Sequence, residues 1–175
     1  MAKALNIDQK RKPSGVDLGS ISIQDEKVVW STDDLVLAEI YFKEIVVIGE
    51  YTNSNGPWFD DWFVTFVSEN GEWSSISVYA ANIEDLIDVL ANRFDEKLKY
   101  FQLADSTRWK SLVRYPISIE GNELFAKKST KDICKPSNIF HKFFSFLGFI
   151  SYLTRYRIEL SDSVKEQVAK SAARA

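Results

Sequence analysis

The chain of 175 residues has one cysteine, one histidine and seven glycines. With Cys134 alone, no disulfide can form within the chain, which fits a reducing compartment such as the cytoplasm. A single histidine, His141, excludes the usual zinc sites and the two-histidine iron site within one chain. GxxxxGK[ST] and GxGxxG motifs are also absent, so we expect no phosphate-binding loop and no cofactor.

Long hydrophobic runs are missing as well. The longest apolar region, 139–153, is interrupted by His141 and Lys142 and is shorter than the roughly 20 residues of a membrane-spanning helix. The first 15 residues contain no apolar stretch of signal-peptide length. We therefore expect no transmembrane segment and a cytoplasmic location.

Hydrophobic residues make up 45% of the chain and aromatic residues 14%, which is enough for a full core. Short runs rich in Val, Ile, Trp, Phe and Tyr are separated by turn signals such as Asn70-Gly71. Their close spacing favours hairpins and hence a mainly antiparallel sheet. The predicted strands within residues 20–80 are 20–23, 27–31, 35–41, 44–51, 58–67 and 73–80.

Apolar residues at spacings of three and four predict an amphipathic helix over 82–101, with Asn82 as its cap. A β-like stretch over 109–119 and a short strand ending at Ala126 follow. Residues 138–153 are apolar nearly all round and predict a buried helix, and Ser163 with Glu166 predicts a capping box for a terminal helix. We expect a flexible arm over 1–19 and one α+β domain over 20–175.

Residues 51–67, YTNSNGPWFDDWFVTFV, combine turn residues, aromatics and two adjacent acids. In a strand, neighbouring side chains point to opposite faces, so Asp60 and Asp61 cannot jointly grip one ligand. The apolar residues on both faces predict a central strand. A cation site formed by Glu50, Asp60 and Asp61 is the basis of an alternative function, a divalent-metal-dependent hydrolase or nuclease.

Charge is distributed unevenly along the chain, although the net charge is only −3. Residues 30–96 contain fourteen acids and two bases, a balance of −12. Residues 97–157 contain twelve bases and four acids, a balance of +8. The two halves could neutralise each other within the fold, or the acidic half could form a surface for a basic protein.

The second alternative predicts a non-enzymatic protein-binding module that engages a basic protein, in the manner of an immunity protein that inhibits a toxin. The residues that we expect at this surface are Asp33, Asp34, Glu50, Trp58, Asp60 and Asp61.

The basic half raises the question of other partners. The segment 108–115, RWKSLVRY, offers bases and aromatics for nucleic acid, but a pI of about 5.3 argues against that partner. As a strand it would direct Lys110 and Arg114 outward. Membrane attachment through 143–157, FFSFLGFISYLTRYR, is disfavoured because a helix apolar on all sides lacks the polar face of an interfacial helix. The aromatic excess of this stretch leaves a homodimer open.

Overall fold

The computed structural model describes residues 18–33, 35–53, 61–103, 106, 108–129 and 156–174. Within these ranges the chain forms nine strands and two α-helices, and all strand ladders are antiparallel. The α+β class with mainly antiparallel sheets, predicted from the sequence, is confirmed. Within the same ranges, neither helix has the length and apolar character needed to cross a membrane.

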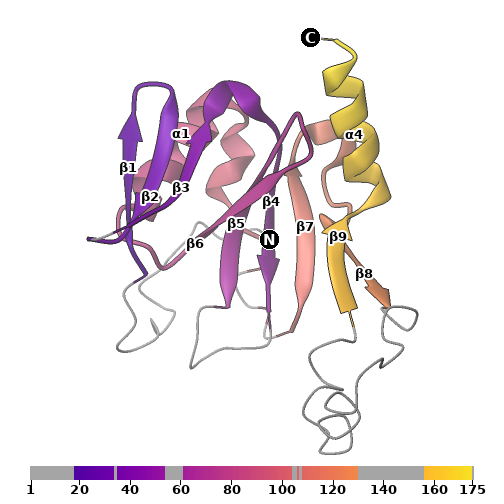
Figure 1. Ribbon diagram of the computed structural model, residues 1–175, viewed down its shortest axis with the longest axis horizontal. Helices are drawn as coiled ribbons and strands as arrows, with labels where there is room; N and C mark the ends of the chain where they lie inside the picture. The colour runs from indigo at the N-terminus through magenta and orange to yellow at the C-terminus, as the bar shows by residue number, and fades with distance from the viewer. Residues whose placement is uncertain are drawn as a thin grey trace, which may run out of the picture.

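The strands form three sheets, which follow one another across Figure 1. The first sheet has the order β1 (Ser20–Gln24), β2 (Lys27–Ser31), β3 (Val36–Tyr41). The second has the order β6 (Trp73–Ser77), β5 (Trp62–Ser68), β4 (Ile45–Thr52), β7 (Lys110–Tyr115). The third consists of β8 (Phe125–Ser129) and β9 (Tyr156–Leu160), whose ladder runs from the pair Phe125 and Leu160 to the pair Ser129 and Tyr156.

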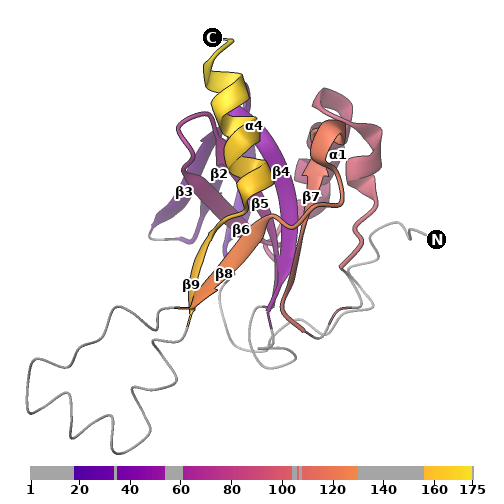
Figure 2. The ribbon, with the colours of Figure 1, turned by 90° about the vertical axis from the view of Figure 1, so that its right-hand side faces the viewer.

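The helices lie on different sides of the second sheet. Helix α1 (Ile83–Arg93) follows β6, and α4 (Asp162–Ala172) follows β9. In Figure 2, α1 and α4 lie on opposite sides of β4, and their buried residues belong to two different core clusters. Short 3-10 turns complete the fold: η2 (Phe42–Glu44), η3 (Glu96–Lys99) and η4 (Ile117–Ile119).

Alternation along β5 divides the interior into two cores. Trp62, Val64 and Phe66 face the first core, which they share with the inner face of the first sheet and with α1. Val67 faces the second core, which β8, β9 and α4 close through Leu124, Phe125, Leu160 and Val164. Strand β5 is therefore central and covered on both faces, as its sequence predicts.

Glycine is required in β4 because of a close approach. A Cβ atom on Gly49 would lie 2.7 Å from Leu124 Cδ2 and 2.8 Å from the Leu112 carbonyl oxygen. Any larger residue would push β4 away from β7 and from the layer that closes the second core.

Several predicted boundaries differ from the structure. Helix α1 ends at Arg93, because the Asp95 side chain accepts a hydrogen bond from the Lys97 amide and starts the separate turn η3. Strand β7 ends before Pro116, which has no amide to donate. Strand β6 ends at Ser77, where a turn begins with the Ala80 amide bonded to the Ser77 carbonyl.

Two helix caps also differ from the predictions. Asn82 precedes α1 in a left-handed backbone conformation. Its side-chain Nδ2 donates to the Ile21 carbonyl, and its side chain does not cap the helix. Helix α4 is capped by Ser161, whose oxygen accepts from the Val164 amide, whereas the sequence predicted Ser163.

Strand β9 was missed entirely, and the predicted helix over 138–153 lies outside the described residues. Of the predicted arm over 1–19, the last two residues belong to the fold. The Leu18 carbonyl accepts from the Trp30 indole, and the Gly19 carbonyl accepts from the Ala81 amide.

Candidate functional site

The predicted partner-binding residues occupy three different environments. Asp33 is exposed in the turn between β2 and β3. Asp61 is half-buried beside the start of β5, and its carboxylate accepts a hydrogen bond from the Tyr79 hydroxyl over 2.7 Å. Glu50 is fully buried in the middle of the second sheet. The remaining predictions, Asp34, Trp58 and Asp60, lie outside the described residues.

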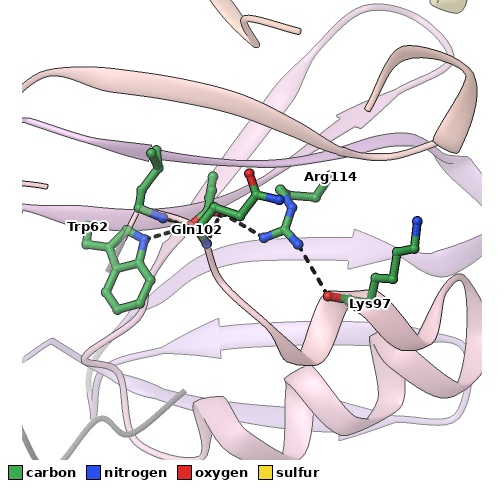
Figure 3. Close-up of polar contacts among 6 residues, drawn as sticks. Trp62, Lys97, Gln102 and Arg114 are labelled. Atoms are coloured by element: carbon green, nitrogen blue, oxygen red, sulfur yellow. Dashed lines mark hydrogen bonds and ion pairs between the residues drawn. The ribbon is translucent and has the colours of Figure 1, made fainter. Parts of the chain in front are cut away.

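Glu50 is the centre of a buried hydrogen-bond network (Figure 3). Its Oε1 accepts from Arg114 Nη1 and from the Gln102 amide, both over 2.8 Å. Its Oε2 accepts from the Trp62 indole and from the Leu103 amide, both over 3.2 Å. Four donors therefore surround one carboxylate, and one of them carries a full positive charge.

This network joins segments that are far apart in the sequence. Glu50 lies on β4, Trp62 on β5 and Arg114 on β7, and Arg114 Nη2 also donates to the Lys97 carbonyl in η3 over 3.3 Å. The two charged side chains are 0% and 4% exposed. A buried charge is tolerated when it is paired and hydrogen-bonded. Within the described residues the pair makes these bonds except at Arg114 Nε, which is buried without a hydrogen-bond partner, so the network is a structural clamp with one unsatisfied donor.

Two sequence-based interpretations need correction at this clamp. Glu50 is not available to a partner or to a metal ion, because its oxygens are already occupied inside the protein. Arg114 points inward, not outward, and cannot contribute to a nucleic-acid surface. Among the residues that the structure describes, no three metal-binding side chains come together.

A sequence signal for the clamp existed. Glu50 interrupts the apolar run IVVIGEY, and Arg114 interrupts LVRYP. A single charge within a strand that is apolar on both sides requires a buried partner of opposite sign.

A cleft between β3 and the β5–β6 hairpin gathers acids from separate parts of the acidic half. It has a volume of about 120 Å³, and its rim includes Glu39 of β3, Glu44 of η2 and Glu72 beside β6. The walls are completed by strand residues such as Tyr41, Phe66 and Ser74. Asp33, Glu50 and Asp61, the three predicted partner-binding residues that the structure describes, do not line this cleft.

The cleft acids differ in their partners. Glu39 pairs with Lys27 over 3.0 Å, and this hydrogen bond raises the pKa of Lys27. Glu72 accepts from the Asn70 amide group within the turn. Across the described ranges, no lysine or arginine forms an ion pair with Glu44 or Glu72.

Ion pairs between the acidic and basic halves are few in the described part of the chain. They are the buried pair of Arg114 with Glu50 and a surface contact of Lys99 with Asp88 over 3.8 Å. Lys97 instead pairs with Glu120 inside its own half. These contacts leave exposed acids such as Glu69, Glu72, Glu84 and Asp85 on the surface.

Beside the cleft, β3 exposes apolar side chains. Leu35, Val36 and Leu37 are 61%, 54% and 40% exposed, and Tyr41 at the other end of the strand is also exposed. An apolar strip bordered by charge is typical of protein-binding surfaces. We define the binding surface of this protein as β3 together with the cleft acids Glu39, Glu44 and Glu72.

Comparisons with known proteins add no functional information. No protein-family model matches this chain, and searches against curated proteins and solved structures returned no significant match.

Proposed function

We propose that this protein is a non-enzymatic binding module, located in the cytoplasm, whose acidic surface engages a basic protein. The observation that supports the proposal is the cleft, where Glu39, Glu44 and Glu72 come from three separate segments and surround one depression. Glu72 is 28 residues from Glu44 in the sequence but lines the same cleft, so the three acids create a local negative field. Such a field attracts Lys and Arg side chains and accelerates association with a basic partner.

The same surface supports protein binding rather than small-molecule chemistry. Its apolar residues on β3 are exposed on a strand, whereas small-molecule sites are enclosed and mostly apolar. The proposal extends to an inhibitory role such as that of an immunity protein, because an acidic patch that covers a basic active site can block it. This extension rests on analogy of mechanism.

The test is capture of a basic protein by the tagged chain from lysate of the native host, with elution by a salt gradient and identification by mass spectrometry. We expect a stoichiometric basic protein that leaves as the salt concentration rises, since screening shortens the reach of surface charges. The double variant Glu44→Gln, Glu72→Gln should lose this protein.

A matched control carries the same change in charge outside the cleft. Glu84→Gln with Asp85→Asn removes two exposed acids from the first turn of α1 and should retain the partner. If both double variants lose the partner equally, or neither does, the cleft is not the binding surface.

A further inference from the structure

Strand β3 has one edge that no described strand covers. It pairs with β2 alone, from Lys27 opposite Tyr41 to Ser31 opposite Val36. In an antiparallel sheet the backbone groups of alternate residues point to each side of a strand. Among the described residues, no backbone hydrogen bond joins the outer edge of Val36–Tyr41 to another element.

This edge is unusually unprotected. Exposed edge strands are normally blunted by lysine, proline or inward-pointing charges, because a free edge is a template for another chain. Residues 35–37 instead present Leu, Val and Leu to solvent. The protective features of β3 are the charged side chain of Glu39 and an irregularity of the ladder opposite Trp30 and Ser31.

The charges beside the edge select what can pair with it. Glu39 lies within β3, Glu44 and Glu72 lie at the cleft beyond its end, and Asp33 is exposed just before its start. A second copy of this chain would bring the same acids against themselves. A segment that carries Lys or Arg would be attracted to Asp33 at one end of the strand and to Glu44 and Glu72 at the other.

We propose that β3 is a docking edge at which an extended basic segment of the partner protein adds as a further strand, with basic side chains directed to the cleft. This inference rests on the proposed function and specifies how the partner is recognised. Main-chain hydrogen bonds hold the segment, and alternate side chains provide specificity, as in other complexes formed by strand addition.

The length of β3 sets the length of the segment. Six residues at about 3.3 Å each extend for roughly 20 Å, so a partner segment of about six to eight residues covers the edge. Because side chains alternate between faces, the matching sequence alternates basic and apolar residues.

The probe is a fluorescein-labelled synthetic peptide, KVKVKVKV, whose binding to the full chain is followed by fluorescence anisotropy at low salt. Its counterpart carries N-methyl groups on two adjacent central residues, which blocks both edges of the peptide without changing its charge. We expect the N-methylated peptide to bind about tenfold more weakly, since the methyl group that faces β3 removes one backbone hydrogen bond and keeps the two strands from approaching closely.

Two protein variants test the edge itself. Val36→Lys places a positive charge on the exposed edge and should weaken binding about tenfold or more. Ile117→Lys makes the same kind of change at another exposed apolar residue, on η4 and outside β3, and should bind the peptide as the natural chain does.

Other outcomes overturn the inference in distinguishable ways. If the N-methylated peptide binds as tightly as its parent, charge alone captures basic partners and strand addition is wrong, while the proposed function is retained. If neither peptide binds, the edge is not a docking site, and the lysate experiment decides the proposed function separately. If sedimentation shows a dimer of the natural chain that Val36→Lys dissociates, the edge serves self-association.

Discussion

At the scale of single residues, the most consequential position is Glu50. Because Glu50 precedes a turn-rich segment, the sequence predicted that its side chain is accessible. In the structure its carboxylate is buried and accepts hydrogen bonds from four donors. Neither Glu50 nor Arg114 is favourable alone in the interior, because an unpaired buried charge costs several kcal/mol. Each of these two buried side chains therefore needs the opposite charge of the other for the folded state to be stable.

We expect Arg114→Met to lower the free energy of unfolding by about 3–5 kcal/mol, because it leaves the Glu50 carboxylate buried without its counter-charge. Urea denaturation followed by tryptophan fluorescence measures the change. Glu39→Gln, which removes the acid of an exposed pair with Lys27, is the control and should shift the midpoint little. Equal shifts in the two variants would contradict the structural role of the clamp.

A second prediction concerns the ion pair of Glu26 with Arg93 over 2.8 Å. The hydrogen bond from Arg93 lowers the pKa of Glu26 below its ordinary value of 4.5. A lowered pKa in the folded state means that the pair stabilises the protein above pH 4.5, and that this contribution is lost as the pH falls through the folded pKa.

NMR titration of the side-chain carboxyl carbons tests this prediction. In Arg93→Gln the pKa of Glu26 should rise towards 4.5. Glu166, whose pKa is lowered by Lys170, should be unaffected and is the internal control. A Glu26 pKa that does not move would show that the ion pair does not form in solution.

At the scale of elements, hydrophobic alternation predicted the strands well where both faces are buried. The range of β2 was predicted to the residue, and the central place of β5 follows from its two apolar faces. Boundaries were less predictable, because side chains such as Asp95 compete locally for backbone groups. Strand β9 was missed although Tyr156, Ile158 and Leu160 alternate with Arg157 and Glu159, the ordinary pattern of a half-covered strand.

The candidate site was less predictable than the fold. That residues 30–96 carry excess acid is visible in the sequence, but the cleft unites Glu39, Glu44 and Glu72 only through the approach of β3 to the β5–β6 hairpin. Tertiary proximity of this kind leaves no periodic signal. Asp60 and Asp61, by contrast, are visible as an acidic pair in the sequence because they are neighbours along the chain.

The cap of α4 provides a test at this scale. Ser161→Ala should lower the free energy of unfolding by about 1 kcal/mol, because it removes the acceptor for the Val164 amide. Ser163→Ala, at the residue that the sequence predicted as the cap, should cost less. Chemical denaturation of both variants measures the difference, and a larger effect at Ser163 would restore the sequence-based assignment.

At the scale of the whole molecule, repulsion among the acidic side chains on the surface lowers the stability of the folded state. Like charges around the cleft repel one another, and they have few basic partners among the residues that the structure describes. Proteins often retain such unfavourable arrangements where binding requires them. The stability of this protein should therefore respond to the same charges that the proposed function uses.

We expect Glu44→Gln with Glu72→Gln to leave the midpoint of urea unfolding unchanged or higher at low salt. Any gain in the unfolding midpoint of the variant over the natural chain should shrink in 1 M salt, where the screening length is about 3 Å. Denaturation of both proteins at the two salt concentrations measures it. A marked loss of stability at both would show that the cleft acids serve the fold and not a partner.

The ladder between β8 and β9 bears on how the length of this chain can change in evolution. Ser129 and Tyr156 form the last pair of this ladder, so the two strands hold together two positions of the chain that are 27 residues apart. The entropy of closing a loop rises by only about 0.6 kcal/mol for each doubling of its length. A change in the number of residues between these two positions therefore alters the closure entropy of the β8–β9 ladder only slightly, so this sheet tolerates connections of different length.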